Sequence, residues 1–504
     1  MQKATDIPIQ AKESTVVAEK KKTSLTTQAP TPVLAPAPHT SAAWQSPTLA
    51  GKAAVNQAGS SPVSGTVVAP ETNLSQLFSH NSSGSRSGET TKIKKGVVKN
   101  NGTRVSHRTG TLNGFGRSSR ANSVDLAGKK TKQICGILDT FKDNLAIIRK
   151  NYAEDEDDTF IPINVVRKYK LQPGDVICGE AREPKENDRY WGLLSITSVN
   201  DAPLEEYLKQ TRVKFHQLTP VYPDEQIKLE TGGEPFSTRI VDMIAPIGKG
   251  QRSLIVSPPK AGKTSFLKEI STGIAANYPD IHLMAVLIGE RPEEVTDMRR
   301  HIEKITHGTG EVAASNFDEA ADAQCRVAEL ALERAKRLVE KGRDVVILLD
   351  SITRLARAYN LSIPTSGRTL SGGFDPAALF PPKRFFGAAR NFEVAGSLTI
   401  IGTALVDTGS RMDDLVYEEF KGTGNQELHL DRRLAERRIY PAIDVQKSGT
   451  RRDDLLIDSL TYQAVLTLER MLDTLNKDER TTTLLEQMKK TKSNKEFLQS
   501  LRHA

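Results

Sequence analysis

Apolar and polar positions divide the 504-residue chain into regions with different patterns. Residues 1–130 are rich in Ser, Thr, Ala, Pro and Gly, and their only aromatic residues are Trp44, Phe78 and Phe115. Such a composition offers too little apolar surface to offset the loss of chain entropy, so we expect this segment to be disordered. Short strand-like runs occupy residues 131–203. After a connector at 204–239, alternating strand and helix patterns predict a larger α/β domain at 240–504.

Five short apolar runs predict a small β-domain at residues 131–203. They cover residues 132–141, 144–150, 158–162, 174–183 and 190–200, and turn signals separate them. Five strands in about seventy residues are typical of a closed barrel of the oligonucleotide-binding (OB) kind, which stacks bases on aromatic rings and follows the backbone with Lys and Arg. Core packing remains the alternative role for each ring. The candidate aromatic and basic residues are Phe160, Tyr190, Trp191, Arg149, Arg167, Lys168, Lys185 and Arg189.

The α/β region contains a strand, a loop and a helix in the order that binds phosphate groups. The apolar run SLIV precedes residues 257–264, SPPKAGKT, and a helical pattern follows. In such a loop the backbone N–H groups and the helix N-terminus point at an anion, Lys263 reaches the β- and γ-phosphates of ATP, and the Thr264 hydroxyl holds Mg²⁺. Ser257 stands where this motif usually has glycine. Together these features predict an ATP site with Mg²⁺.

Two carboxylates stand at the ends of predicted strands in the same region. The run DVVILLD ends at Asp350, which we expect to orient the ligands of Mg²⁺; a helix N-cap is the alternative role. The run HLMAVLIGE ends at Glu290, which we expect to activate water; a salt bridge to Arg291 is the alternative. Charge on the γ-phosphate also calls for a cation, often an arginine of another subunit. The sequence does not rank the candidates Arg354, Arg437, Arg438 and Arg451.

A Gly-Gly loop follows the second of these strands. Residues 365–375 read TSGRTLSGGFD, and the stretch PPKRFFGAARN comes soon after. A long exposed loop in a compact domain is often functional, so this loop is a candidate contact for a polymer that passes the domain. The alternative is a plain connector.

Positive charge is concentrated near the end of the N-terminal segment. The whole chain carries a net charge of +8, and between Arg86 and Lys132 there are twelve Lys and Arg residues against only Glu89 and Asp125. This basic arm is a candidate contact for nucleic-acid phosphates, and a solvated linker is an equally good interpretation. The chain shows neither an apolar run of eighteen residues nor an apolar secretory signal, and its three cysteines are widely spaced. We therefore expect a cytoplasmic protein without membrane segments whose reduced cysteines are apolar fillers.

Several longer stretches make the chain similar to bacterial transcription termination factor Rho, a family of hexameric RNA-dependent ATPases and helicases with a RecA-type motor. The stretches are PIGKGQRSLIVSPPKAGKT, ERPEEVTDMRR, DSITRLARAYN, LSGGFDPAALFPPKRFFGAARN, YEEFKGTGNQELHLDRRLAERRIYPAID and SGTRRDDLL. The resemblance covers residues 132–500. It implies an OB or cold-shock-like barrel, a RecA-type ATPase domain and a helical end. It also implies a homohexamer that binds single-stranded nascent RNA, acts on RNA polymerase and has elongation factors as candidate partners.

The resemblance implies roles for residues of the ATP site. Glu290 resembles the family's water-activating acid, Arg354 an arginine that senses the γ-phosphate, and Arg451 the arginine finger supplied by a neighbouring subunit. Asp350 would act on Mg²⁺ through water, together with Thr264. The residues that would enclose ATP are Gly248, Lys249, Gly250, Gln251, Arg252, Ser253, Lys260, Ala261, Gly262, Lys263, Thr264 and Ser265, with Arg291 near the nucleotide and Tyr440 stacked on adenine.

The resemblance also implies two RNA sites. The primary site in the barrel would use Arg149, Asp158, Phe160, Lys185 and Tyr190. The secondary site, on two central loops of a ring, would use Arg368, Leu370, Ser371, Gly372, Gly373, Thr408, Gly409 and Arg411. Leu145 and Ile147 replace two aromatic residues on which the family stacks bases, so weaker or less pyrimidine-selective binding is expected. The basic arm is a candidate source of the lost affinity.

Two other functions fit part of the sequence. A ring ATPase of the rotary or export type also carries Gly-Glu-Arg at the catalytic strand end, as residues 289–291 do, but it lacks the Ser-Gly-Gly loop. A non-catalytic RNA-binding protein with a degenerate motor is the third interpretation, and Ser257 is the one feature that favours it. The intact set Lys263, Thr264, Glu290, Asp350 and Arg451 argues for an active ATPase.

Overall fold

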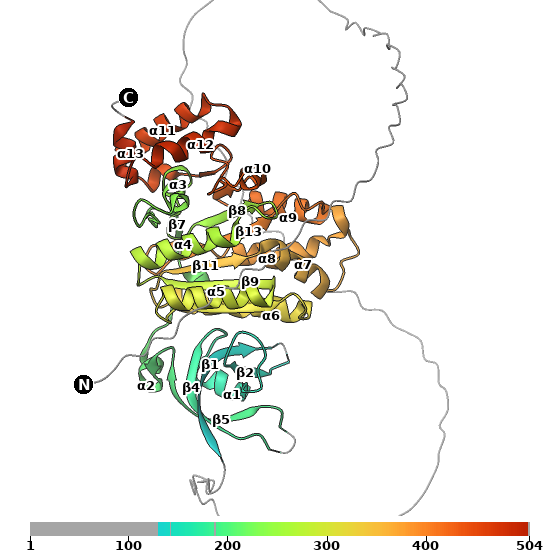
Figure 1. Cartoon of the computed structure of the whole chain (residues 1–504). Coiled ribbons are helices and arrows are strands. Elements are labelled where there is room, and N and C mark those ends of the chain that lie inside the picture. The colour runs from blue at the N-terminus through green and yellow to red at the C-terminus, as the bar shows by residue number, and fades with distance from the viewer. Residues whose placement is uncertain (1–129, 142, 186–187, 502–504) are drawn as a thin grey trace, which may run out of the picture. The chain divides into compact units, whose positions relative to one another are not determined.

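The computed structural model describes residues 130–141, 143–185 and 188–501. The predicted disordered segment and almost all of the basic arm lie outside these residues. A barrel whose strands are antiparallel except at the closing pair precedes a large sheet with helices on both of its faces (Figure 1). Every described helix is too short or too polar to cross a membrane.

The first domain is the predicted five-stranded barrel, which the structure confirms. Its sheet has the order β3-β2-β1-β4-β5-β6, and the additional pairing of β3 with β5 closes it. Leu138, Ile148, Ile177 and Val199 contribute to a small apolar core inside it. The elements are β1 (Thr131–Thr140), β2 (Ala146–Arg149), β3 (Thr159–Phe160), α1 (Ile163–Lys168), β4 (Val176–Arg182), β5 (Trp191–Val199) and the short β6 (Ala202–Pro203).

The expectation that all three cysteines are unpaired is wrong for two of them. Cys135 of β1 and Cys178 of β4 are register partners on neighbouring antiparallel strands, their Cα atoms are 4.0 Å apart, and a disulfide joins them. The pairing brings together residues that are 43 positions apart in the sequence, so spacing alone gave no sign of it. Cys325 is free and buried, as expected of an apolar filler.

The residues between the barrel and the main sheet form short elements. They are α2 (Leu204–Lys209), the 3-10 helix η1 (Phe215–Gln217), β7 (Pro220–Val221), which pairs with β12 (Asn391–Phe392), and α3 (Phe236–Ile244). Phe215 of η1 packs edge-on against Phe392 of β12. The connector is therefore packed against the α/β domain.

The α/β domain is built on a seven-stranded sheet of order β10-β9-β11-β13-β8-β14-β15. All neighbouring strands are parallel except β14 and β15, which are antiparallel. The strands are β8 (Arg252–Ser257), β9 (His282–Glu290), β10 (Glu311–Asn316), β11 (Val345–Asp350), β13 (Leu398–Leu405), β14 (Gln426–His429) and β15 (Gly449–Thr450). The parallel sheet predicted from the alternating pattern is confirmed.

Helices connect these strands and cover both faces of the sheet. They are α4 (Lys263–Asn277), α5 (Pro292–Ile305), α6 (Ala321–Val339), α7 (Ile352–Ser362), α8 (Phe380–Phe386), α9 (Arg411–Lys421) and α10 (Arg432–Glu436), with 3-10 helices η2 (Ser371–Gly373), η3 (Pro376–Leu379) and η4 (Asp453–Leu455). The predicted helical end contains α11 (Ser459–Asp473), α12 (Lys477–Met488) and α13 (Asn494–Ser500).

Successive residues of the central strands point into two separate cores. Met284 and Val286 of β9 pack in the core that α6, α7, α8 and α9 cover, whereas Leu283 and Ala285 pack in the core that α3, α4 and α5 cover. Every residue of β9 and of β11 is buried. This is the pattern of a parallel sheet between two helical layers, and it holds the carboxyl ends of neighbouring strands at one rigid edge.

Candidate active site and nucleic-acid interface

The predicted phosphate loop joins the end of β8 to the start of α4. Lys260 has φ +66° and Gly262, the N-cap of α4, has φ +92°, so the chain turns through the left-handed region twice. Ser257 is buried at the end of β8, and its hydroxyl donates a hydrogen bond to the carbonyl oxygen of Pro258 over 3.0 Å. The departure at Ser257 therefore fits inside the turn. The N-terminus of the fifteen-residue α4 opens toward the loop, as anion binding requires.

Three predicted catalytic residues meet at the carboxyl edge of the sheet. The Nζ of Lys263 lies 2.5 Å from Oδ1 of Asp350 and 3.5 Å from Oε1 of Glu290. Thr403 of β13 donates a hydrogen bond to the same Asp350 oxygen over 2.8 Å. The adjacent strands β9 and β11 end at Glu290 and Asp350, so the sheet itself sets the spacing of the two carboxylates.

Arg354, on the first turn of α7, completes this cluster. Its Nη2 lies 3.3 Å from Oε2 of Glu290, and its Nη1 donates to the carbonyl oxygen of Gly289. Arg291 is not a partner of Glu290 but lies 3.9 Å from Glu294 on α5. The salt bridge between Glu290 and Arg291, considered as the alternative role, is therefore not formed. Glu290 forms its ion pairs with Lys263 and Arg354. Ser351, rather than Asp350, caps α7 by accepting the Arg354 backbone N–H.

Burial and neighbouring charge shift the titration of this cluster. Burial, reinforced by the Asp350 carboxylate, raises the pKa of Glu290 to about 7 despite the opposing cations. Burial works to lower the pKa of Lys263, but Asp350 and Glu290 outweigh it and raise that pKa above its usual value. A carboxyl that titrates near neutral pH, next to a fixed cation, is suited to accept a proton from water.

The donor set at this edge fits Mg²⁺. Thr264, the second residue of α4, offers a hydroxyl beside Lys263, and Asp350 offers a carboxylate from the end of β11. Hard oxygen donors of this kind suit Mg²⁺, which keeps several waters and takes further ligands from substrate phosphates. The described residues contain no group of three or more His, Cys, Asp or Glu able to hold a metal.

Tyr440 lies over the phosphate loop. A Cβ atom placed on Gly262 would be 3.5 Å from Cε1 of Tyr440, and the tyrosine side chain is 55% exposed. An exposed ring next to the loop can stack on a base, which is the role implied by the resemblance.

Residues 248–253 do not join this cluster within one chain. They precede or begin β8, about 17 Å of strand away from the phosphate loop. Gln251 and Ser253 are buried there, and Lys249 is paired with Glu225 at 2.8 Å and Asp344 at 3.0 Å. The two predicted ATP-binding segments, adjacent in sequence, therefore lie at opposite ends of one strand.

Arg451 belongs to this opposite end. Its backbone N–H and the Nε2 of Gln251 both donate to the carbonyl oxygen of Asn425, over 2.9 and 3.1 Å. Burial, together with nearby Arg390 and Arg451, lowers the pKa of Arg252. The Arg451 side chain is exposed and has no hydrogen-bond or ion-pair partner among the described residues. Arg252, Arg390 and Arg451 thus lie away from the phosphate loop, with no ion pair to a carboxylate in the part of the chain that the structure describes.

The predicted primary RNA site contains a buried, partly unsatisfied carboxylate. The guanidinium of Arg149 donates to Asp139 over 2.8 Å and to Asp158 over 2.7 Å. Asp158 is completely buried, yet its Oδ1 has no hydrogen-bond partner, and burial raises its pKa. Because this oxygen is shielded from solvent, the amino group of a base can reach it only after neighbouring side chains move.

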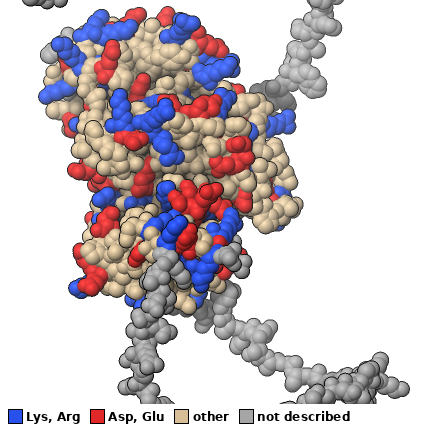
Figure 2. All heavy atoms as spheres, turned by 60° about the horizontal axis from the view of Figure 1, so that its bottom comes forward, with Lys and Arg blue, Asp and Glu red and all other residues tan. Residues whose placement is uncertain are grey.

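Aromatic groups lie near this acceptor on the barrel. Phe160 is 38% exposed on β3, which pairs with β2 and β5, and Tyr190 directly precedes β5. Ile147, opposite Phe160, is buried, so it offers no stacking surface. Lys185 is exposed nearby in sequence, whereas Lys132 covers Trp191 with its Nζ 3.8 Å from the ring centroid. On the face shown in Figure 2, Lys and Arg side chains are interspersed with Asp and Glu.

The two predicted pore loops lie side by side. A Cβ atom on Gly372 would come within 2.6 Å of the backbone nitrogen of Met412, at the start of α9. Thr408 donates to Asp413 over 2.6 Å and so fixes the second loop to the same helix. Arg368 and Arg411 are exposed, with no side-chain partner among the described residues. Two loops from different segments thus present free cations next to one another.

Three residues of these sites were missed in the sequence. Asp139 shares Arg149 with Asp158, Thr403 holds Asp350, and Asn425 organises the Arg451 end. Asp139 is a charged residue near the end of an apolar strand, and this pattern could have marked it in the sequence as a candidate site residue. Thr403 and Asn425 have no signal of their own, because their role depends on which strands are neighbours.

Comparisons with known proteins match both domains. Residues 134–205 match the family model "Rho termination factor, RNA-binding domain", and residues 237–450 match "ATP synthase alpha/beta family, nucleotide-binding domain". Transcription termination factor Rho of Bacillus subtilis is 55% identical over 351 residues, which are 70% of this chain and 80% of that protein. The Rho of Thermotoga maritima is 52% identical over 366 residues, 72% of this chain and 84% of that protein. A solved ATPase of a type III secretion system is 22% identical, with a TM-score of 0.48, over 57% of this chain and 86% of that one.

Proposed function

Because the chain belongs to the family of Rho transcription termination factors, we propose that it is an ATP-driven RNA translocase that loads on nascent RNA and ends transcription by releasing that RNA from RNA polymerase. The meeting of Lys263, Glu290 and Asp350 at the phosphate loop, in the same chain as an RNA-binding barrel, carries this proposal. Coupling of these two parts would turn ATP hydrolysis into movement along RNA.

In the proposed hydrolysis step, Lys263 exchanges its carboxylate partners for the β- and γ-phosphates of ATP. Thr264 and Asp350 would hold Mg²⁺, which would supply positive charge next to the phosphate oxygens. Glu290, freed from Lys263 and still oriented by Arg354, accepts a proton from the attacking water. Tyr440 stacks on the adenine.

We further propose that the site is completed by a second copy of the chain in a ring of six. Arg451 is exposed and has no counterion among the described residues, and it lies at the end of β8 opposite the phosphate loop. An arginine from the neighbouring subunit would stabilise the charge that develops on the γ-phosphate. Residues 248–253, which lie on the same end as Arg451, would face that neighbouring nucleotide as well.

RNA would be bound in two places. The barrel captures a base between Phe160 and Tyr190, with the free oxygen of Asp158 as the acceptor for its amino group. The loops that carry Arg368 and Arg411 grip the backbone of the strand at the centre of the ring. Alternating motion of these loops during hydrolysis would pull the RNA.

The test is ATP hydrolysis by the full chain with and without single-stranded RNA, followed by RNA release from stalled RNA polymerase. We expect hydrolysis to depend on RNA, and release to depend on ATP and to be lost in Lys263→Ala. Equal hydrolysis without RNA would contradict the translocase and favour an export-type or rotary ring ATPase. Release that survives Lys263→Ala would favour the non-catalytic RNA-binding protein.

A further inference from the structure

Helix α7 contacts the candidate ATP site and the bases of both predicted pore loops. Near its start, Arg354 pairs with Glu290 of the ATP site. One turn later Arg357 lies 2.6 Å from Asp413 and donates to Ser410 over 3.2 Å, next to the second pore loop. Near its end, the side-chain oxygen of Asn360 accepts the backbone N–H of Asp375 over 2.8 Å, at the base of the first pore loop. A small shift of α7 would therefore be felt at the nucleotide and at both loops.

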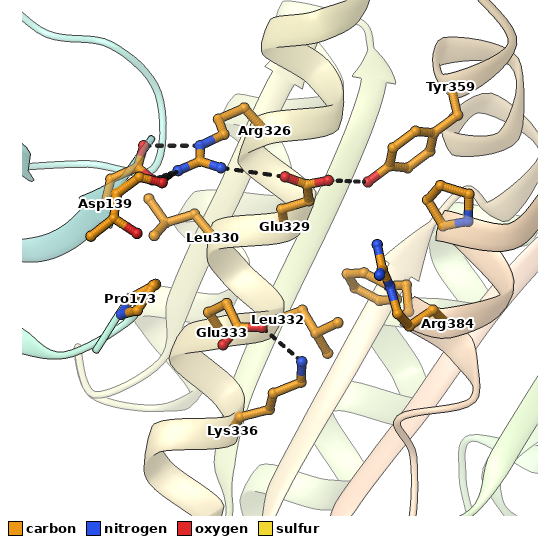
Figure 3. Close-up of a pocket in the computed structure, with 13 residues that line it drawn as sticks. Asp139, Pro173, Arg326, Glu329, Leu330, Leu332, Glu333, Lys336, Tyr359 and Arg384 are labelled. Carbon is orange, nitrogen blue, oxygen red and sulfur yellow. Dashed lines mark hydrogen bonds and ion pairs between the residues drawn. The ribbon is translucent and has the colours of Figure 1, made fainter. Parts of the chain in front are cut away.

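A chain of polar contacts runs from the end of this helix to the barrel. The hydroxyl of Tyr359 on α7 donates to Glu329 of α6 over 3.0 Å, and Glu329 lies 3.4 Å from Arg326 (Figure 3). Arg326 in turn donates to both carboxylate oxygens of Asp139 and, over 2.6 Å, to the carbonyl oxygen of Thr140. These contacts cross from the α/β domain to β1 of the barrel.

Asp139 joins this chain to the candidate base-binding pocket. It accepts from Arg149, and the same guanidinium holds Asp158, the carboxylate with the unpaired oxygen. From the barrel inward, charges alternate in sign from Asp158 through Arg149, Asp139 and Arg326 to Glu329. Asp139 and Arg149 are almost completely buried, where ionic contacts are screened weakly by solvent.

We propose that Tyr359, Glu329 and Arg326 are positioning residues that couple occupancy of the barrel's RNA site to the placement of α7, and through α7 to ATP hydrolysis. The inference rests on the proposed function, because it concerns RNA-stimulated hydrolysis. A ligand that draws Arg149 or Asp158 toward itself weakens the contact between Arg149 and Asp139. Asp139 then pairs with Arg326 alone. Arg326 then turns away from Glu329, which changes the hold of Glu329 on Tyr359.

The space beside these residues allows two arrangements. A cavity of about 350 Å³ is lined by Asp139, Arg326, Glu329, Tyr359 and Arg384, among others. Figure 3 shows these side chains around it, with Arg384 on the side opposite Asp139. Side chains that border open space can change partners without moving a packed core, which is what a two-state element needs. Burial and the Glu329 carboxylate keep the pKa of Tyr359 above its usual value, so its hydroxyl stays a donor.

A second link between the same two domains supplies a matched control. The hydroxyl of Tyr152 in the barrel donates to Glu311 of β10, which also lies 3.2 Å from Arg334 of α6. Tyr152 and Tyr359 are each 6% exposed and each donate to one glutamate. Glu311 also lies 3.4 Å from Nε2 of His282 at the start of β9, so this second link ends on β9, β10 and α6 and makes no hydrogen bond or ion pair with α7 among the described residues. It holds the barrel in place, as does the close approach of Gly174, where a Cβ atom would lie 2.4 Å from the backbone of Glu333.

The test compares Tyr359→Phe with Tyr152→Phe in the full chain. Each variant loses one buried hydroxyl and one hydrogen bond to a glutamate, so their thermal stabilities are expected to fall by similar amounts. We expect Tyr359→Phe to lower the stimulation of ATP hydrolysis by saturating single-stranded RNA about fivefold, while unstimulated hydrolysis and the affinity for a short cytidine-rich oligonucleotide stay unchanged. Tyr152→Phe is expected to keep the stimulation of the wild-type chain.

Each result bears on the coupling. Equal stimulation in both variants, whether reduced or intact, would overturn it. Glu329→Gln, which keeps an acceptor for Tyr359 but removes the charge facing Arg326, is expected to reproduce the loss and provides a second variant if Tyr359→Phe does not fold. If RNA does not stimulate ATP hydrolysis by the wild-type chain, the proposed function itself is contradicted. This outcome differs from the one that overturns the coupling alone.

Discussion

Beyond the carboxyl end of β8 the ammonium group of Lys263 lies between the carboxylates of Glu290 and Asp350, whereas at its amino end Arg451 is exposed with no counterion among the described residues. The side chains of the first group are at most 15% exposed, and each already touches an opposite charge. The second group keeps Arg252 near Arg390 and Arg451, so like charges are gathered there. One end of the strand therefore holds paired opposite charges, and the other holds arginines with no counterion among the described residues.

This difference indicates how the work of the site is divided. The phosphate-loop end is organised before nucleotide binds, because Glu290 and Asp350 already hold the ammonium group of Lys263 in place. At the other end, the described residues provide no carboxylate for Arg451, so its guanidinium is available to pair with a negative charge from outside the chain. We therefore expect substitutions at the two ends to remove the same activity for different physical reasons, and the following measurements test that expectation.

The largest expected effect is on turnover. Arg451→Ala is expected to lower kcat for RNA-stimulated ATP hydrolysis by about 10³-fold, since arginine fingers contribute on this scale. The neighbouring Arg452 provides the control, because it already forms an exposed pair with Asp454 at 3.0 Å. Arg452→Ala should leave kcat close to the wild-type value. A loss shared by both variants would mean that the substitutions disturb η4 and not the nucleotide.

Mixing of two inactive variants tests whether Arg451 acts across a subunit boundary. Arg451→Ala subunits keep an intact phosphate loop, and Lys263→Ala subunits keep an intact arginine. If the two ends of β8 serve different nucleotides, rings that contain both variants hold some complete sites, and hydrolysis reappears on mixing. If Arg451 serves the nucleotide of its own chain, every subunit carries one defect and the mixture stays inactive.

The next effect separates the two ends by stability. Lys263→Ala leaves Glu290 and Asp350 side by side without their shared cation, so we expect it to lower the free energy of unfolding by about 1–3 kcal/mol. Arg451→Ala removes an exposed and unpaired charge and should change that free energy by less than about 0.5 kcal/mol. The control is Lys268→Ala. Lys268 lies on the same helix as Lys263 and forms an exposed ion pair with Asp297 of α5. Equal unfolding midpoints for all three variants would contradict the comparison.

The sequence was sufficient for the features that depend on local pattern. Alternating runs and turn signals identified the five barrel strands, and the loop between β8 and α4 was recognisable from its Gly-Lys-Thr ending. Carboxylates at the ends of apolar strands were expected to meet at the loop, and Glu290 and Asp350 do lie next to Lys263 there. In a parallel sheet, position along the strand is enough to predict which edge a residue occupies.

Features that depend on register or on contacts between domains were out of reach. Cys135 and Cys178 are paired because β1 and β4 are neighbours in one particular register. Residues 248–253 and the phosphate loop are adjacent in sequence, yet the length of β8 separates them. The contact of Asp139 with Arg326 joins residues that are 187 positions apart in the sequence and lie on two domains. No local pattern carries information of this kind.

The smallest expected effect concerns the titration of Glu290, whose pKa of about 7 is raised by burial and by Asp350. As the general base, Glu290 must be ionised, so kcat/KM for ATP should fall by about tenfold per pH unit as the pH drops below about 7. A flat profile there would remove Glu290 from the role of base. The same ionisation should affect stability in the opposite direction, because the folded chain holds its proton up to about pH 7, whereas an unfolded Glu releases it near 4.5.

Raising the pH through this interval therefore destabilises the folded wild-type chain, and Glu290→Gln does not have that cost. We expect the unfolding midpoint of Glu290→Gln, measured relative to wild type, to improve between about pH 5.5 and about pH 8. Asp242, whose pKa burial also raises to about 7, titrates in both chains and cancels from the difference. If the relative midpoint worsens with pH instead, the ion pairs with Lys263 and Arg354 outweigh the burial of Glu290. The phosphate-loop end would then be stabilised by its own charges more strongly than the raised pKa implies.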